Sequence, residues 1–153
     1  MTIEFNEDII DFNDIIERYE ELKDQLESLT GKDQGDFGSF DYWIEYAVAN
    51  PPESLPAIEY EELLEELQNL RQVIDETQGY GGDVQYEGNW YPGVLVNEDY
   101  FVDYAKQLVE DCGDVPSNLP WYIERHIDWE GVADDIKQDY GSITVAHSEY
   151  YYR

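Results

Sequence analysis

Between Asn6 and Leu29 the chain reads NEDIIDFNDIIERYEELKDQLESL, and its apolar residues recur at intervals of three and four. These residues are Ile9, Phe12, Ile16, Tyr19, Leu22, Leu26 and Leu29. Such spacing places side chains on one face of an α-helix. Gly31 follows, and glycine is typical of the position just after a helix. The pattern therefore predicts one amphipathic helix from Asn6 to Leu29.

The opposite side of this predicted helix carries a row of acids. They recur at the same intervals and are Glu7, Asp11, Asp14, Glu17, Glu21 and Asp24. Neighbouring Cβ atoms in such a row lie ~5–6 Å apart, so the carboxylates would form a line comparable to a row of phosphates. An ordinary solvated face usually interleaves basic residues, and here only Arg18 and Lys23 do so. A solvated face and a partner-binding face both remain open.

The whole chain is strongly acidic. Its 153 residues include 37 Asp and Glu against eight Lys and Arg, which gives a net charge of −29. This charge argues against direct binding to nucleic acid or to an anionic membrane, because both require basic residues to neutralise phosphates. It equals the charge of ~50 Å of duplex DNA, or ~15 base pairs. Four Trp, 14 Tyr and five Phe are spread among the acids, which indicates a folded chain rather than a disordered acidic tail.

Residues 1–80 read as an acidic helical region with 22 acidic and four basic residues. A short aromatic helix is predicted over residues 40–49, before Pro51 and Pro52. A second amphipathic helix is predicted from Tyr60 to about Thr77. Its outer face carries further candidate acids for partner binding, namely Glu61, Glu62, Glu65 and Glu66. The glycines at 79, 81 and 82 close this region and mark the predicted domain boundary.

Residues 81–153 change to a mixed pattern with 15 acidic and four basic residues. Alternating apolar residues predict strands at 84–86 and 94–96 and one or two more within 143–152, whereas 88–93 reads as a turn. One helix should follow a cap at Asn97, bury Cys112 and end at Gly113, and another should follow a cap at Asp128. Residues 122–127 are expected to be extended. The predicted fold class is therefore α+β, with an acidic helix-rich half followed by a small α+β domain at 81–153.

No motif indicates an enzyme. His126 and His147 stand in no nucleophile or zinc motif, and Cys112 is the single cysteine, so no disulfide framework or Cys-based zinc site is possible. Residues 33–44 and 75–86 fail the EF-hand positions. Carboxylate pairs occur throughout, so a two-carboxylate hydrolase cannot be refuted by counting, but their presence is no evidence for one. We therefore expect no catalysis, no cofactor and no metal.

The chain is expected to be cytoplasmic. No run approaches the ~20 apolar residues that span a bilayer. The first residues, Met1 to Phe5, lack the basic start and apolar stretch of a secretory signal. A lone cysteine also suits a reducing compartment.

Three segments of the second half resemble the C-terminal domain of the ArdA antirestriction proteins. They are the helix segment Asn97–Ala105, the loop Asp114–Leu119 with its Val-Pro-x-x-Leu pattern, and the aromatic-acidic helix Ile127–Ile136. Asp134 stands where an Arg is common in that family, which makes this surface still more negative. The resemblance covers about 94–153. The first 80 residues lack the initial strand and the Asn-Gly-x-x-x-Gly-x-Trp-like motif of the family, so the N-terminal helix is expected to be a replacement module.

The resemblance implies a DNA mimic from a phage or mobile element. ArdA proteins are elongated homodimers that occupy the DNA-binding groove of type I restriction-modification enzymes. By this likeness the chain would be an elongated homodimer that binds a basic groove of a host defence complex in a bacterial cytoplasm. The acids of the second half expected to stand in for phosphates are Asp103, Glu110, Asp111, Asp114, Asp128, Glu130, Asp134, Asp135 and Asp139.

Two other functions fit the same composition. The first is DNA mimicry against a different defence system, such as a CRISPR effector. The second is an acidic interaction protein, either a chaperone of basic proteins or a protein of a salt-loving organism, whose proteome is acidic throughout.

Overall fold

The computed structural model describes residues 2–116 and 118–153, so Ser117 of the Val-Pro-x-x-Leu loop lies outside the described residues. The chain combines helices with antiparallel strands, which confirms the α+β class. It divides into two compact units, the first formed by segments 1–3 and 13–76 and the second by segments 4–12 and 77–153. The first unit's segments contain 18 acidic and four basic residues, and the second unit's contain 19 and four. Each unit is therefore strongly acidic by itself.

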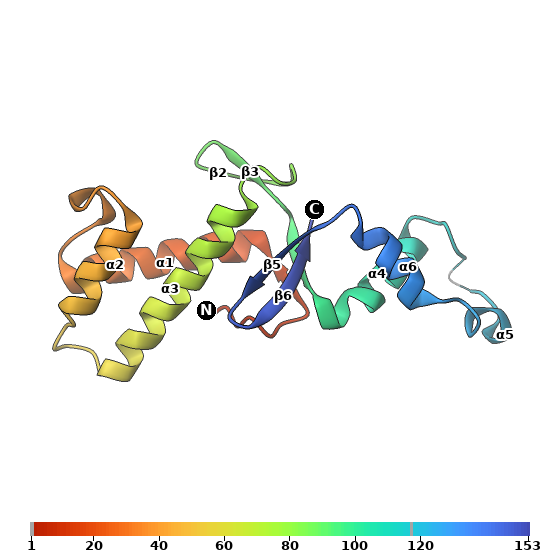
Figure 1. Ribbon diagram of the computed structural model, residues 1–153, viewed down its shortest axis with the longest axis horizontal. Coiled ribbons are helices and arrows are strands. Elements are labelled where there is room, and N and C mark those ends of the chain that lie inside the picture. The colour runs from red at the N-terminus through yellow and green to blue at the C-terminus, as the bar shows by residue number, and fades with distance from the viewer. Residues whose placement is uncertain (1, 117) are drawn as a thin grey trace. The chain divides into compact units, whose positions relative to one another are not determined.

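Three helices build the first unit (Figure 1): α1 (Phe12–Thr30), α2 (Phe40–Ala49) and α3 (Ala57–Thr77), with a short 3-10 helix, η1 (Gln34–Asp36), between α1 and α2. Their apolar faces meet in a core whose members are at most 2% exposed: Ile15, Tyr19, Leu22, Leu26, Trp43, Ala47, Leu67, Leu70 and Val73. The Tyr60 hydroxyl on α3 donates a 2.7 Å hydrogen bond to the Ala47 carbonyl at the end of α2. The helices predicted at 40–49 and 60–77 are confirmed.

The prediction of one helix from Asn6 to Leu29 is wrong at its start. Residues Ile9–Asp11 form strand β1, and the helix begins only at Phe12. Side chains alternate in a strand, so Ile10 is buried and Ile9 is exposed. The β-branched pair Ile9–Ile10 suits a strand, and pairing with a distant strand overrides the helical spacing.

This start also changes which residues of α1 face inward. The buried stripe continues through Ile15, whereas Ile16 is only half-buried. The predicted stop at Gly31 is confirmed, since its φ of 69° is the left-handed conformation and its N–H reaches the Glu27 carbonyl at 2.8 Å. A glycine adopts that conformation without the strain a Cβ would cause.

A four-stranded antiparallel sheet with the order β1-β4-β6-β5 organises the second unit. Its other members are β4 (Val94–Asn97), β5 (Gly141–Val145) and β6 (Ser148–Tyr152). In register, Ile9 lies opposite Val96, Val96 opposite Tyr151, and Ile143 opposite Tyr150. A separate ribbon pairs β2 (Val84–Tyr86) with β3 (Asn89–Tyr91), so the segment 88–93 contains a strand in addition to the predicted turns.

The described residues of the second unit form three α-helices and one 3-10 helix. They are α4 (Phe101–Asp111), α5 (Trp121–Glu124), α6 (Trp129–Lys137) and η2 (Glu98–Tyr100). Helix α4 packs against α6 and β4 around the buried residues Val96, Phe101, Ala105 and Ala133. The predicted cap of α6 is confirmed, because the Asp128 side chain accepts the Gly131 N–H at 3.0 Å. The Asn97 side chain accepts the Asp99 N–H at 2.9 Å, but it caps η2 rather than α4, which begins after Tyr100 without a side-chain cap.

Two further expectations for the second half are wrong. Cys112 is exposed rather than buried, because it follows the last turn of α4 at the C-cap, just before the chain turns at Gly113. Residues 121–124 are helical rather than extended. Pro120 precedes this turn, and its carbonyl accepts hydrogen bonds from the N–H groups of Ile123 and Glu124. Over the described residues, we find no helix with the length and apolarity needed to cross a bilayer.

Candidate functional site

Helix α1 presents a row of exposed carboxylates from Asp14, Glu17, Glu21 and Asp24. From Asp14 to Asp24 the helix rises by ten residue steps, or ~15 Å at 1.5 Å per residue, so the row holds one charge per ~5 Å of helix. One strand of B-DNA places a phosphate every ~3.4 Å along its axis. The row therefore approaches the charge density of a single strand. Glu7 and Asp11 are exposed but belong to the second unit, before and within β1, so they do not continue this helical row.

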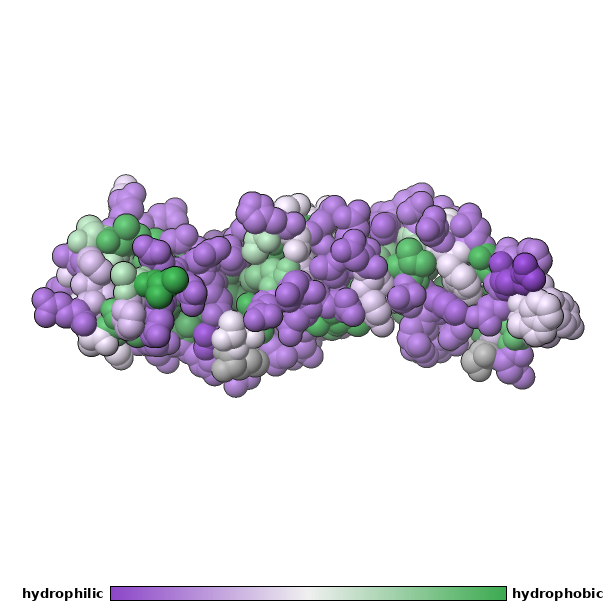
Figure 2. All heavy atoms as spheres, turned by 90° about the horizontal axis from the view of Figure 1, so that it is seen from below, coloured by the Kyte–Doolittle hydropathy of each residue, from purple (hydrophilic) through white to green (hydrophobic). Residues whose placement is uncertain are grey.

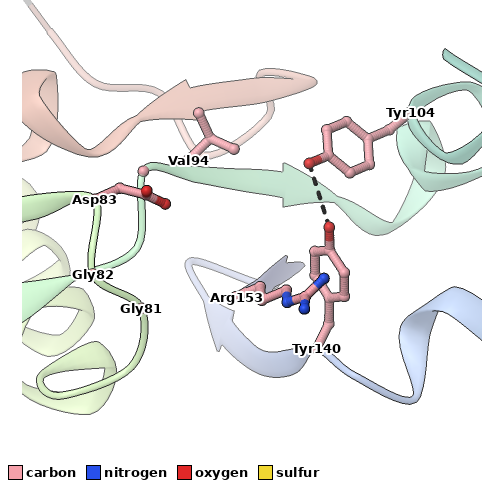
Figure 3. Close-up of a pocket in the computed structure, with 8 residues that line it drawn as sticks. Gly81, Gly82, Asp83, Val94, Tyr104, Tyr140 and Arg153 are labelled. Atoms are coloured by element: carbon pink, nitrogen blue, oxygen red, sulfur yellow. Dashed lines mark hydrogen bonds between the residues drawn. The ribbon is translucent and has the colours of Figure 1, made fainter. Parts of the chain in front are cut away.

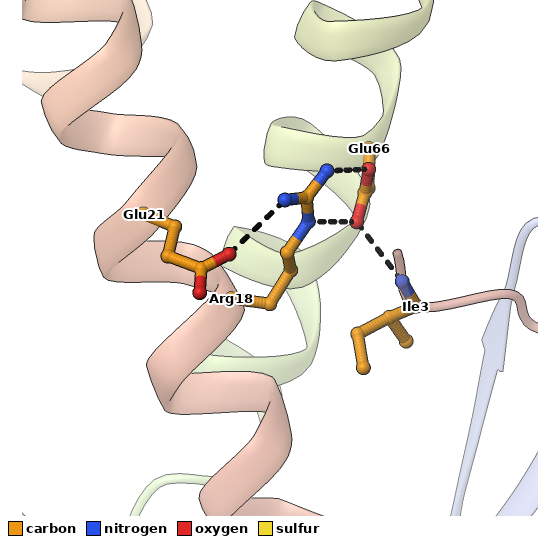
Figure 4. Close-up of polar contacts among 4 residues, drawn as sticks. All are labelled: Ile3, Arg18, Glu21 and Glu66. Carbon is orange, nitrogen blue, oxygen red and sulfur yellow. Dashed lines mark hydrogen bonds and ion pairs between the residues drawn. The ribbon is translucent and has the colours of Figure 1, made fainter. Parts of the chain in front are cut away.

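Helix α3 presents a second acidic face with Glu61, Glu62 and Glu65 exposed. Glu66 differs from them because its side chain is only 13% exposed and points toward α1 (Figure 4). Its carboxylate accepts two hydrogen bonds from Arg18, from Nε at 2.7 Å and from Nη2 at 3.0 Å. Glu66 is thus engaged inside the first unit, whereas its neighbours face solvent.

Most candidate acids of the second unit are also exposed: Asp103, Asp111, Asp114, Asp128, Glu130, Asp134, Asp135 and Asp139. Glu110 is half-buried. Asp128 has a structural task as the cap of α6, and Asp134 lies 3.9 Å from Lys137. On the face drawn in Figure 2, hydrophilic residues dominate and hydrophobic ones occupy smaller patches.

Several basic residues are held against aromatic rings. Arg71 on α3 lies 5.0 Å from the Phe40 ring centroid, and Lys137 on α6 lies 4.9 Å from that of Tyr151. Lys106 on α4 lies 5.6 Å from the Trp129 ring and 2.6 Å from the Glu124 carboxylate. Each of these cations also pairs with a partly exposed carboxylate, Arg71 with Asp75, Lys106 with Glu124 and Lys137 with Asp134.

Two carboxylates meet at the junction of η2 and β6. Coulombic repulsion by Glu149 raises the pKa of Glu98 above its usual value, and a hydrogen bond between the two side chains acts in the same direction. Lys137 partly opposes this effect, and Asp99 adds to it. The second unit therefore contains two acidic side chains that repel each other at close range, in addition to its exposed acids.

The second unit also contains an open pocket of about 470 Å³ (Figure 3). Tyr104 and Tyr140 line it, with their hydroxyl oxygens 3.4 Å apart, and Arg153, Asp83, Val94 and three glycines complete the wall. Burial, together with the Tyr104 hydroxyl, raises the pKa of Tyr140 well above its usual value. The phenol is therefore protonated at neutral pH and is a poor nucleophile.

The pocket adds no group suited to acid-base chemistry near neutral pH. His126 and His147 are both exposed, and neither lines it. Among the described residues, no group of three or more His, Cys, Asp or Glu side chains could hold a metal ion.

Sequence reasoning missed an exposed apolar patch at α5, made of Trp121, Tyr122 and Ile123. Trp121 is 70% exposed, and Arg125 lies 5.8 Å from its ring. A pocket of about 410 Å³ lies beside it, lined by Trp121, Arg125, Lys106 and Trp129 among others. The run Trp-Tyr-Ile directly after Pro120 is the signal that could have identified an exposed apolar patch on an acidic chain.

Comparison with protein families places these features in context. Residues 2–151 match the family model described as antirestriction protein (ArdA). The match includes the first 80 residues, so the expectation that the likeness begins near Val94, after a replacement module, is wrong. No match was found among curated proteins or among solved structures. Because the family match spans nearly the whole chain, the protein belongs to the ArdA family of antirestriction proteins, which inhibit restriction-modification enzymes rather than catalyse a reaction.

Proposed function

We propose that the protein is a DNA mimic that blocks the DNA-binding groove of a type I restriction-modification complex. Its exposed carboxylates would take the places of phosphates against the Lys and Arg residues of that groove. The proposal places the protein in the cytoplasm of a bacterium that carries a phage or a mobile element. It rests most directly on one observation, the rows of exposed acids on α1 and α3.

The charge distribution of the first unit supports this proposal. The first unit has 14 more acidic than basic residues, which matches ~24 Å of duplex. Two of its four basic residues, Arg18 and Arg71, contact Glu66 and Tyr19 within the unit, and each also pairs with one exposed acid of its own helix, Glu21 or Asp75. A groove that binds phosphates would therefore meet carboxylates over most of this surface.

Physical chemistry sets the expected behaviour of such an inhibitor. Opposite charges steer the two proteins together and speed association at low salt. Salt at ~0.15 M shortens the screening length to ~8 Å, so the affinity should fall with ionic strength. Carboxylates on folded helices are already arranged, so binding avoids the deformation energy that bending DNA requires.

A competition experiment tests the proposal. The purified chain is titrated into a complex of fluorescent duplex and a type I methyltransferase core at low salt. We expect release of the duplex, and a polyglutamate of equal net charge should be a much weaker competitor because its charges are not fixed in rows. Failure of the folded chain to release the duplex would contradict the proposal.

A pull-down from bacterial lysate separates the remaining alternatives. Recovery of type I restriction subunits would support the proposal. Recovery of a CRISPR effector would favour mimicry against another target, and recovery of many unrelated basic proteins would favour a general acidic interaction protein.

We also infer that the protein forms a homodimer through the apolar patch at α5. Two chains of charge −29 repel each other, so their association needs an apolar contact. Trp121, Tyr122 and Ile123 offer such a contact. The adjacent Arg125 and Lys106 suit the acidic surface of a second copy and would be repelled by a basic groove.

A further inference from the structure

Arg18 lies between two acidic helices. Its guanidinium forms a two-bond ion pair with Glu66 of α3 and also donates a 3.1 Å hydrogen bond to Glu21 of its own helix (Figure 4). Its side chain is 16% exposed. The hydrogen bonding that Arg18 donates to the Glu66 carboxylate is the main cause that raises the pKa of Arg18 above its usual value. The ion pair therefore joins α1 to α3.

Glu66 has an additional partner that fixes its position. Its Oε2 accepts the backbone N–H of Ile3 at 3.1 Å, and the same oxygen accepts Arg18 Nε. Both oxygens of the carboxylate are therefore engaged within the first unit. A two-bond pair between Arg and a carboxylate fixes orientation as well as distance, because both groups are planar and their two parallel hydrogen bonds restrict rotation.

The electrostatics of α1 and α3 make such a link necessary. Asp14, Glu17 and Asp24 on one helix and Glu61 and Glu65 on the other are all exposed. Like charges on two packed helices push the helices apart. Removing Arg18 would take away the attraction and would also leave the largely buried Glu66 carboxylate without its cation, which is strongly unfavourable.

We propose that Arg18 is a positioning residue that holds the carboxylate rows of α1 and α3 as one binding surface, with Glu66 as its anchor rather than as a mimic of phosphate. The inference rests on the proposed function and deepens it. By charge alone, a basic residue on this surface should weaken binding to a basic groove. The proposal predicts instead that Arg18 strengthens this binding.

Because charge and positioning predict opposite changes in affinity, two matched variants can distinguish them. Arg18→Met and Lys23→Met each remove one positive charge from α1, and among the described residues no ion pair of Lys23 is seen. If charge alone mattered, both variants would compete with duplex DNA slightly better than the wild type. We expect Lys23→Met to do so and Arg18→Met to compete roughly fivefold less well, a difference of about 1 kcal/mol. Equal or improved competition by Arg18→Met would overturn the proposal.

The salt dependence separates positioning from simple loss of stability. If the two rows separate, fewer carboxylates reach the groove together, so the plot of log affinity against log salt should be shallower for Arg18→Met. A variant that is only less stable keeps the wild-type slope at temperatures where circular dichroism shows it folded. An unchanged slope would therefore contradict the proposal.

A double variant tests the role of Glu66. Arg18→Met with Glu66→Met removes both charges and replaces the ion pair with an apolar contact, which often preserves stability. We expect it to recover most of the competition lost in Arg18→Met, and Arg18→Lys to recover part of it. A double variant as weak as Arg18→Met would show that Glu66 contacts the target itself, and this would overturn the proposal.

The behaviour of the wild-type chain distinguishes a failure of the proposed function from a failure of the positioning role of Arg18. If the wild-type chain fails to release duplex DNA, the proposed function is contradicted. If it releases duplex and the Arg18 variants behave like the Lys23 variant, only the positioning role is contradicted.

Discussion

The guanidinium of Arg71 donates a 2.8 Å hydrogen bond to the phenol oxygen of Tyr19. This contact joins α3 to α1 and turns the basic residue of α3 toward the core. Its Nε also reaches Asp75 at 3.0 Å. Together with the Arg18–Glu66 pair, it places two cations where they stabilise the packing of two like-charged helices. Each of these cations also pairs with an exposed acid of its own helix, Arg18 with Glu21 and Arg71 with Asp75.

Neutralising the row on α1 should weaken binding to the target. The triple variant Asp14→Asn, Glu17→Gln, Asp24→Asn removes three exposed charges, each worth about 0.5 kcal/mol against a cation. We expect a loss of roughly tenfold in competition with duplex DNA, and about twofold for any single change.

A second triple variant serves as the control for position. Asp41→Asn, Glu45→Gln and Glu53→Gln remove the same charge from exposed sites of the first unit outside the two rows. This control should lose much less affinity. Equal losses in both variants would show that total charge rather than the row determines binding.

Two variants of Asp128 distinguish its role as the cap of α6 from the effect of its negative charge. Asp128→Asn keeps a side-chain acceptor for the Gly131 N–H, whereas Asp128→Ala removes it. We expect Asp128→Ala to lower the free energy of unfolding by about 1 kcal/mol and Asp128→Asn to change it little. If Asp128 contacts the target, both variants should compete about twofold less well. Unchanged competition by Asp128→Asn would remove Asp128 from the proposed binding surface.

The apolar patch at α5 should control the oligomeric state. We expect the wild type to sediment as a dimer at micromolar concentration and the double variant Trp121→Ala, Ile123→Ser to sediment as a monomer. Trp90→Ala is the control, because Trp90 is an exposed tryptophan on β3 of the same unit. A double variant that remains dimeric would place the dimer contact elsewhere, and a monomeric wild type would exclude the homodimer under these conditions.

The paired carboxylates Glu98 and Glu149 should make stability depend on pH. A carboxyl group whose pKa is raised by folding contributes stability that is present below the ordinary glutamate pKa of ~4.3 and is lost as pH rises through the raised value. Glu149→Gln removes the repulsion, so we expect its Tm to exceed that of the wild type at pH 7 and to match it near pH 4. Glu4→Gln, at an exposed site of the same unit, should show a smaller difference. Equal melting temperatures of Glu149→Gln and the wild type at pH 7 would contradict the repulsion.

Local signals were sufficient for the helices that combine regular spacing with a clear stop. Helix α2 ends at Ala49, before Pro51 and Pro52, and α6 begins at the Asp128 cap, as their sequences predict. The strand β1 could not be predicted in this way, because its three residues also fit the helical spacing that follows them. Pairing with β4, far along the chain, decides its conformation.

The exposed acids of the candidate site were identifiable from the sequence, but their partners were not. Spacing placed Glu66 beside Glu62 and Glu65 on one outer face, and nothing local indicated that Arg18 would draw it inward. Cys112 fits the apolar spacing of α4, but the helix ends one residue before it. Such outcomes depend on tertiary contacts and on where the last turn ends, which spacing alone does not determine.

The central claim is that the acidic surface and duplex DNA occupy the same groove. The most direct test measures the apparent affinity of the chain for the methyltransferase core at increasing concentrations of duplex, at fixed low salt. If both ligands bind one groove, the apparent Kd rises in proportion to the duplex concentration without limit. A Kd that reaches a plateau would mean that the chain and DNA bind together at different sites, and this would contradict DNA mimicry.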